Sequence, residues 1–339
     1  MRRFWCVVVC WLVWSPPSGV SVMCGAGPLA PPPGPIAPTA RPLAEIEPRT
    51  ALGPTTTPGD FNAVYVIAQP GSYFLAGDLD VPAGRVGVRI EARDVRLDLG
   101  GFAIRGQAGA ADGVRIVDSG DGVAGGAVSV ANGSISSFAG SGVAGANVSL
   151  RLASLDVTDT GGDAIVAGPR SLVDRCRVQV GGDRGIVVGS HALVTRCSTF
   201  DMDQIGIELG ADAVALECVA VNQRFGFRLG AGARAEGCWA TNSIVVGIEA
   251  GDRAAVTRCA AALGFVGIRA AGTGARIEEN QVVNNGIGIE AVNPGNLIIR
   301  NVAHVNGTAI SAASGNTVGP IADESTVLLI NSPAANYDY

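Results

Sequence analysis

The acidic residues near the middle of the chain are the side chains whose types and spacing most readily suggest chemistry. Five aspartates and one arginine lie beside Gly-rich turns: Asp159, Asp163, Asp183, Asp201, Asp203 and Arg184. Clustered carboxylates on adjacent structural repeats could bind Ca²⁺, and the ion would then bridge an acidic sugar to the protein. Aspartate is also an ordinary turn residue, because its side chain bonds the local backbone. The turn interpretation is favoured, and the six residues remain the candidate calcium or substrate-binding set.

A row of evenly spaced cysteines offers a second kind of chemistry, a metal or redox row. Successive members are about 21 residues apart, and two asparagines continue the position: Cys176, Cys197, Cys218, Cys238, Cys259, Asn280 and Asn301. Sulfurs stacked in line cannot surround a metal tetrahedrally, and one strand spacing is longer than the Cβ separation that a disulfide prefers. The spacing therefore predicts a structural ladder of buried free thiols and amides, with no metal firmly assigned.

A second repeat runs in phase with this ladder and identifies the elements that position it. A glycine followed by alternating apolar residues recurs at intervals of about 21 residues from Gly185 to Gly288, and looser copies bring the total to eleven. Each repeat holds short runs of three to five residues with the length and period of strands. Leucine-rich repeats need fixed leucines and a helical segment, which are missing here. The expected fold is all-β, a parallel β-helix (solenoid) of about eleven coils of ~21 residues.

Two rows of charged residues follow the same period and face outward. One row alternates in sign and comprises Glu208, Arg228, Glu249, Arg269 and Glu290. The other lies just before the Cys/Asn ladder and comprises Arg175, Arg196, Glu217, Gly237, Arg258, Glu279 and Arg300. Opposite charges one strand apart attract weakly, so a self-neutralised solvent face is favoured over a charged track for sugars.

Composition narrows the classes of function. The chain has 339 residues, a formal net charge of −6 and no lysine. Lysine-based catalysis is therefore excluded, and the charge gives no reason to expect nucleic acid as a partner. His191 and His304 are isolated in the sequence and are interpreted as turn or surface residues.

The first residues are typical of a targeting segment. Arg2 and Arg3 precede an apolar run of eleven residues from Phe4 to Trp14, which is short of the roughly 20 residues that span a bilayer. We predict a cleaved signal peptide over residues 1–26 and no membrane span in the mature chain. Lipidation at Cys24 is not favoured, because Met23 precedes it. The protein is expected to be secreted, periplasmic or at the cell surface.

The remaining boundaries follow from composition. Residues 27–59 are rich in proline and are expected to form a disordered linker. The β-helix is expected over 60–331, with an N-terminal cap between Asp60 and Asp80 and a last strand at Thr326 to Ile330. Residues 332–339 are expected to be a polar tail.

Three segments carry a resemblance to a known group of proteins. Gln69 to Tyr73, Gly87 to Ile90 and Val95 to Gly106 resemble the opening of bacterial right-handed β-helix repeat proteins of the pectin-lyase-like superfamily. The likeness covers about residues 60 to 330. It implies a right-handed, single-stranded parallel β-helix, and it is weak for activity because the superfamily includes lyases, hydrolases, epimerases and tailspikes.

The catalytic patterns of that superfamily are not intact in this chain. The His-Gly element of its hydrolases is absent, since His191 precedes Ala192 and His304 precedes Val305. The Asp-Pro-His element of the alginate epimerases is also absent. Catalytic residues are therefore unassigned, and whether the chain is an enzyme stays open.

Two functions remain in view. In the first, the chain is an exported β-helix protein that binds, and in a stronger version processes, an extracellular polysaccharide or cell-surface glycan along the helix flank. In the second, it is a non-catalytic structural or adhesive surface rod. Ca²⁺ is the one cofactor considered, through the aspartate set.

Overall fold

The computed structural model describes residues 49–117, 128–323, 325 and 332–338. Their strands pair in parallel from coil to coil, and no helix occurs among them. None of the described residues therefore forms a helix long and apolar enough to cross a membrane. The expected signal peptide, Cys24, most of the linker and the expected strand at Thr326 to Ile330 lie outside the described residues.

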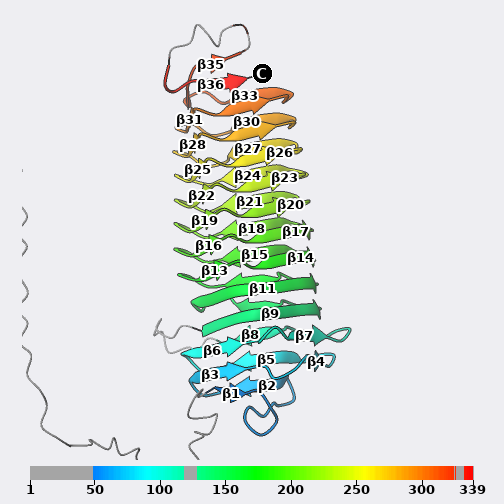
Figure 1. Cartoon of the computed structure of the whole chain (residues 1–339). Coiled ribbons are helices and arrows are strands. Elements are labelled where there is room, and N and C mark those ends of the chain that lie inside the picture. The colour runs from blue at the N-terminus through cyan, green and yellow to red at the C-terminus, as the bar shows by residue number, and fades with distance from the viewer. Residues whose placement is uncertain (1–48, 118–127, 324, 326–331, 339) are drawn as a thin grey trace, which may run out of the picture. The chain divides into compact units, whose positions relative to one another are not determined.

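One strand of every coil belongs to a twelve-stranded sheet, here called face 1 (Figure 1). Its strands, in spatial order, are β2 (Ala63–Ile67), β5 (Val86–Ile90), β8 (Val114–Ile116), β10 (Val143–Gly145), β12 (Ile165–Ala167), β15 (Arg184–Val188), β18 (Ile205–Leu209), β21 (Phe225–Leu229), β24 (Val246–Ala250), β27 (Val266–Ala270), β30 (Ile287–Ala291) and β33 (Thr308–Ala312).

The other strands form a 24-stranded sheet that is folded lengthwise into two faces. Face 2 holds β1 (Thr50–Ala51), β3 (Gly71–Phe74), β6 (Val95–Asp98), β13 (Leu172–Asp174), β16 (Leu193–Thr195), β19 (Val214–Leu216), β22 (Arg234–Glu236), β25 (Ala255–Thr257), β28 (Arg276–Glu278), β31 (Leu297–Ile299) and β34 (Thr317–Val318). Face 3 holds β4 (Leu79–Val81), β7 (Ala103–Gly106), β14 (Arg177–Gly181), β17 (Ser198–Met202), β20 (Val219–Val221), β23 (Trp239–Thr241), β26 (Ala260–Ala262), β29 (Gln281–Val283), β32 (Val302–His304), β35 (Ile321–Ala322) and β36 (Asn336–Asp338). Two long strands, β9 (Val128–Phe138) and β11 (Leu150–Thr160), run across both faces.

The prediction of an all-β parallel solenoid is confirmed, and the number of coils is twelve, not eleven. Equivalent positions on neighbouring coils are typically about 21 residues apart, as Asp163 and Arg184 are. The additional coil contains β2, in which Tyr65 stands opposite Val88 of β5. The expected cap thus contains the first rung of face 1. Ordered pairing also extends past the expected boundaries, because Thr50 pairs with Tyr73 and Tyr337 pairs with Val302.

From the coil of β9 onward, the chain turns at single residues with left-handed backbone geometry. At the corner between faces 3 and 1 these residues have φ between 49° and 63°, and they are Ser137, Asp159, Val180, Asp201, Asn222, Asn242, Leu263, Asn284 and Val305. The corner between faces 2 and 3 is made by the second predicted charge row, from Arg175 to Arg300, with φ between 51° and 62°. One such residue reverses the side-chain direction while the ladder of backbone hydrogen bonds continues into the next strand.

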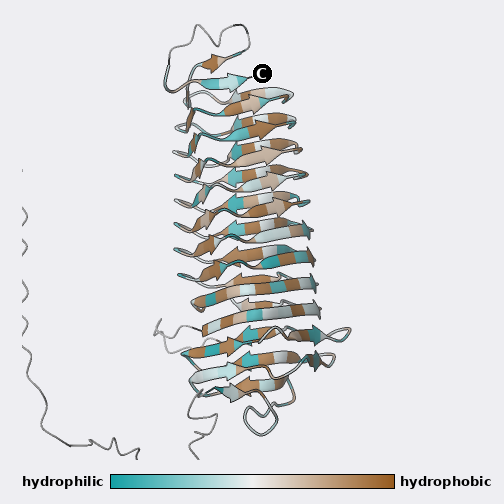
Figure 2. Ribbon diagram, in the orientation of Figure 1, coloured by the Kyte–Doolittle hydropathy of each residue, from teal (hydrophilic) through white to brown (hydrophobic). Residues whose placement is uncertain are grey.

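The core is thin and consists of stacked small and branched side chains. Figure 2 shows hydrophobic and hydrophilic residues interspersed along the strands. The repeated glycine is required by close approach of the next coil. A Cβ on Gly206 would lie 2.7 Å from the carbonyl oxygen of Gly226, and one on Gly226 would lie 2.5 Å from that of Gly247. A larger residue at this position would push neighbouring coils apart.

Candidate functional site

The five cysteines of the ladder are free and buried. Each points the same way as its neighbour one coil away. The backbone N–H of Cys176 donates to Cys197 Sγ at 3.4 Å, and the Cys197 thiol donates to the carbonyl oxygen of Thr195 at 3.2 Å. Hydrogen bonds with Cys197 and Cys238, together with burial, raise the pKa of the Cys218 thiol. The row is therefore a packed part of the core.

The asparagines take over the same bonds with amide groups. Cys259 N–H donates to Asn280 Oδ1 at 2.9 Å, and Asn280 N–H donates to Asn301 Oδ1 at 3.0 Å. Asn336 continues the ladder, accepting from Asn301 N–H at 3.0 Å. Sequence analysis missed Asn336 because the 35 residues that separate it from Asn301 are far more than one ordinary coil.

Arg184 and Asp163 are the members of the aspartate set that form an ion pair. Two guanidinium nitrogens of Arg184 donate to the Asp163 carboxylate at 2.9 and 2.6 Å, and a third donates to Glu208 Oε2 at 2.6 Å. The hydrogen bond to Asp163, followed by that to Glu208, raises the pKa of Arg184. This arginine is fully neutralised and joins three successive coils of face 1.

The other four aspartates do not converge on a common point. Asp159 and Asp201 occupy the left-handed corner between faces 3 and 1, and Asp201 accepts a hydrogen bond from Asn222 Nδ2 at 2.8 Å. Asp183 and Asp203 are exposed turn residues. Across the described residues, no three His, Cys, Asp or Glu side chains are grouped so that they could hold a metal ion. These four aspartates lie in turns or at the left-handed corner, and their role in binding calcium or a substrate stays a prediction.

The alternating charge row on face 1 is internally paired. Glu249 lies 3.1 Å from Arg228 and 3.8 Å from Arg269, and Arg269 lies 2.6 Å from Glu290. Residues that neutralise one another in this way offer little charge to a ligand.

A pocket of about 610 Å³ lies on face 2, over the first coils of the solenoid. It is lined by Gly71, Ser72, Asp94, Arg96, Ser129 and Arg151. Four of these residues form one outward column on successive strands, since Ser72 pairs with Arg96, Arg96 with Ser129, and Ser129 with Arg151. Sequence analysis did not identify this column, because the repeat is irregular in these coils.

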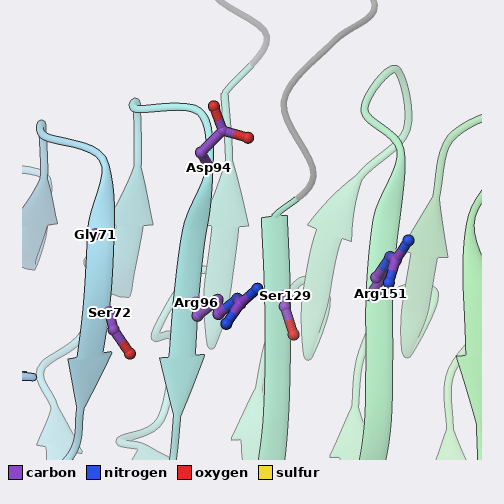
Figure 3. A pocket seen from close by; sticks show the side chains of 6 residues that line it. All are labelled: Gly71, Ser72, Asp94, Arg96, Ser129 and Arg151. Carbon is purple, nitrogen blue, oxygen red and sulfur yellow. The ribbon is translucent and has the colours of Figure 1, made fainter. Parts of the chain in front are cut away.

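Arg96 and Arg151 differ from the arginines of face 1 in having no ion-pair partner among the described residues. Both side chains are exposed. Asp98, which follows Arg96 by two residues on β6, is already engaged by Arg49 at 3.1 Å, by the backbone N–H of Gly100 and by Asn132. Figure 3 shows Arg96 extending from β6 toward Ser129, while the Asp94 carboxylate lies at the preceding turn. Within the part of the chain that the structure describes, the pocket therefore presents two guanidinium groups that no carboxylate neutralises.

This column is suited to binding an anion that extends along the solenoid. Arg96 and Arg151 are two rungs apart, roughly 9.6 Å at ordinary strand spacing. Guanidinium groups donate in a fork that matches carboxylate, sulfate or phosphate oxygens, and the serine hydroxyls can both donate and accept.

Comparison with solved structures supports the architecture. The A-module of mannuronan C-5 epimerase AlgE4 from Azotobacter vinelandii superposes with a TM-score of 0.57 at 14% identity, over 80% of this chain and 88% of that one. The chain is a parallel β-helix protein. The lacto-N-biosidase of Eubacterium ramulus is also similar, with a TM-score of 0.49 at 12% identity, over 74% of this chain and 62% of that one. The Dettilon tailspike protein has a TM-score of 0.48 at 13% identity, over 82% of this chain and 60% of that one.

Sequence comparison adds nothing to this fold assignment, since no protein-family model and no curated protein sequence matches the chain. At these low sequence identities, the structural similarity establishes the fold of this β-helix protein. Its function has to be inferred from its own residues.

Proposed function

We propose that this β-helix protein is exported and binds an acidic polysaccharide along face 2, with Arg96 and Arg151 as the anion-binding residues. The observation that carries the proposal is a pair of arginines on alternate rungs of one column, neither of which has an ion-pair partner among the described residues. Elsewhere on the described solenoid, most guanidinium groups are engaged by carboxylates or backbone carbonyls, as Arg184, Arg228 and Arg269 illustrate.

The geometry favours a polymer over a small anion. One rung of the solenoid advances by about 4.8 Å, so the two arginines are separated by about the length of a disaccharide. A chain of acidic sugars lying parallel to the axis would bring alternate carboxylates to Arg96 and Arg151. Ser129, between them, and Ser72, beyond Arg96, would bond the sugar hydroxyls. The similar epimerase module, whose name states that it acts on mannuronan, is in accord with such a ligand.

Binding without turnover is the form of the proposal that the pocket supports. Guanidinium groups remain protonated and do not serve as ordinary bases. Asp94 is the one carboxylate among the six lining residues, and Figure 3 shows it apart from the arginine column. The residues of the pocket therefore supply charge and hydrogen bonds to a ligand.

The test is calorimetric titration of the full chain with oligogalacturonate and oligomannuronate, with a neutral glucose oligosaccharide beside them. We expect the acidic oligosaccharides to bind and the neutral one not to bind. Arg96→Ala and Arg151→Ala should each weaken affinity about 10- to 100-fold, since a hydrogen bond to a charged group contributes about 1.5–3 kcal/mol. Added salt should weaken binding of the acidic ligand.

Arg234→Ala is the matched control. Arg234 lies on β22 in the same outward column of face 2, is exposed, and has no ion-pair partner among the described residues, yet it is outside the pocket. Its substitution should leave affinity unchanged. If no acidic oligosaccharide binds, or if all three substitutions weaken binding equally, the pocket is not the binding site. The first of these outcomes would leave the structural rod as the better account.

A further inference from the structure

A column of polar side chains lines the inside of the corner between faces 3 and 1, and the proposed function does not use it. Each member stands two residues after the end of a face 3 strand, and the members are Gln223, Ser243, Gly264, Asn285 and Asn306. In the last coils this column is an amide ladder. Gly264 N–H donates to Asn285 Oδ1 at 3.0 Å, and Asn285 N–H donates to Asn306 Oδ1 at 2.9 Å.

The amides of this column also donate to backbone carbonyls of the preceding coil. The donor and acceptor pairs are Gln223 and Thr199 at 2.9 Å, Asn285 and Ala261 at 3.0 Å, and Asn306 and Val282 at 2.9 Å. Ser243 and Gly264 carry no amide. Within the described coils, the carbonyls that correspond to these two residues, those of Ala220 and Ala240, therefore receive no such bond. The ladder of amides is broken over two coils.

Two polar atoms at this break have no hydrogen-bond partner among the described residues. They are Gln223 Oε1 and Ser243 Oγ, and both residues are only 1% exposed. A buried polar atom without a partner is costly, and the great majority of such atoms in native proteins are hydrogen-bonded to protein or to ordered water. A group that can both donate and accept hydrogen bonds is therefore expected beside these two oxygens.

The Ser243 side chain ends where an amide would continue. Its Oγ lies 3.2 Å from the position that a Cβ on Gly226 would take, and Asn285 Cγ lies 3.2 Å from the equivalent position at Gly267. Ser243 Oγ thus corresponds to Asn285 Cγ, and the amide oxygen and nitrogen beyond that atom have no counterpart in serine. A water molecule, whose share of liquid volume is about 30 Å³, has the size of these two missing atoms.

We infer that the interior of the solenoid binds a water molecule at this break, between Gln223 Oε1 and Ser243 Oγ. The water donates to Gln223 Oε1 and to the carbonyl of Ala220, and it accepts from the Ser243 hydroxyl. Three hydrogen bonds are typical of a buried water. Both side chains are neutral, which favours water over a cation that needs several charged or carbonyl oxygens. The site is independent of the polysaccharide proposal, because the arginine pocket lies on face 2.

The experiment is a crystal structure of the full chain, with magnetic relaxation dispersion of water in solution to count long-lived internal waters. The crystal structure should show one water within about 3.2 Å of both oxygens. Ser243→Asn should displace it, since the new amide continues the ladder, so the count should fall by one and the melting temperature should rise. Ser243→Leu has the shape of asparagine without its polar atoms. It should also lower the count by one, but the melting temperature should fall because Gln223 Oε1 then has no partner.

Ser198→Asn is the matched control, because Ser198 faces outward on β17 and is half-buried. The same substitution there should leave the number of long-lived waters unchanged. A crystal structure in which the two oxygens bond each other directly, or in which no water bridges them, would overturn the inference. An equal water count in Ser243→Asn and the unsubstituted chain would also overturn it. The crystal structure of the unsubstituted chain decides the matter even if a variant fails to fold.

Discussion

The same position of the coil is filled by thiols from Cys176 to Cys259 and by amides from Asn280 to Asn336. In both stretches the backbone N–H of one coil donates a hydrogen bond to the side chain at the same position of the next coil. Cys238 N–H donates to Cys259 Sγ at 3.4 Å, and Asn280 N–H donates to Asn301 Oδ1 at 3.0 Å. The amide also donates inward, as Asn280 Nδ2 does to the carbonyl of Val256 at 2.9 Å. The same backbone geometry therefore accommodates thiol side chains, which form weaker hydrogen bonds, and amide side chains, which form stronger ones.

Amide ladders gather in the last coils of the solenoid. A second ladder joins Asn285 to Asn306 at 2.9 Å, and a third joins Asn296 to Asn316 at 2.9 Å. Coils near an end of a solenoid have fewer neighbours against which to bury apolar surface. Directional amide bonds at three positions compensate for this by fixing each coil to the next. The middle coils, which are covered on both sides, can rely on packing by thiols and alanines.

The largest effect should come from breaking the amide ladder at its centre. Asn301 accepts hydrogen bonds from Asn280 N–H and Asn280 Nδ2, and it donates to the carbonyl of Ile277 at 3.0 Å. Asn301→Ala leaves these buried groups without partners and should lower the free energy of unfolding by about 3 kcal/mol. Urea denaturation, with hydrogen exchange to locate the loosened coils, measures the loss.

Asn301→Cys is the control that the chain itself suggests, since cysteine holds the same position in five other coils. It restores a weak acceptor and most of the volume, so the loss should be about half that of Asn301→Ala. Equal losses of unfolding free energy in the two variants would contradict this prediction. The hydrogen bonds of the ladder would then contribute nothing to stability beyond the packing of the side chains.

The reverse change should sharpen the comparison with a smaller effect. Cys259 borders the amide ladder, because its backbone N–H already donates to Asn280 Oδ1. Cys259→Asn extends the ladder by one coil and should raise the free energy of unfolding by about 1 kcal/mol. Cys176→Asn, at the far end of the thiol row, has no amide neighbour and should not stabilise the protein. Chemical denaturation of both variants decides the matter, and a gain at position 176 equal to that at 259 would contradict it.

Regular repetition made most of the fold predictable. From Ala164 onward the coils are nearly constant in length, so the strands, the ladder from Cys176 to Asn301 and the paired charges of face 1 followed from spacing alone. The first coils have longer turns, and there the β2 rung was assigned to the cap. Asn336 was missed for the same reason, since an insertion separates it from its column. The right-handedness of the coil stays a prediction.

The candidate site could not be predicted from the sequence, because it depends on arginines that have no carboxylate partner among the described residues. Arg96 and Arg151 look like any other outward arginine in the sequence, and their importance arises from a neighbouring Asp98 that is engaged by Arg49. Asp163 and Arg184 were selected for their proximity to turns, yet the fold brings them together as a neutral pair. Whether a charged side chain is neutralised depends on its contacts with the neighbouring coils. The repeat spacing predicts these contacts in the regular coils, but it does not predict them in the irregular first coils.

An effect no larger than this concerns the exposed corner between faces 3 and 1, where acidic, amide and apolar residues share one column. Val180 adopts φ of 49° there, which a β-branched residue tolerates poorly, while Asn222 in the same column has φ of 62° and donates to Asp201. Val180→Asn relieves the strain and lets the new amide donate to Asp159, so it should stabilise the protein by roughly 1 kcal/mol. The matched reversal, Asn222→Val, should destabilise it by a similar amount, as measured by thermal and urea unfolding. Because Val180 is more than half exposed, neither change disturbs the core, and a stability loss in Val180→Asn would show that backbone strain does not govern this corner.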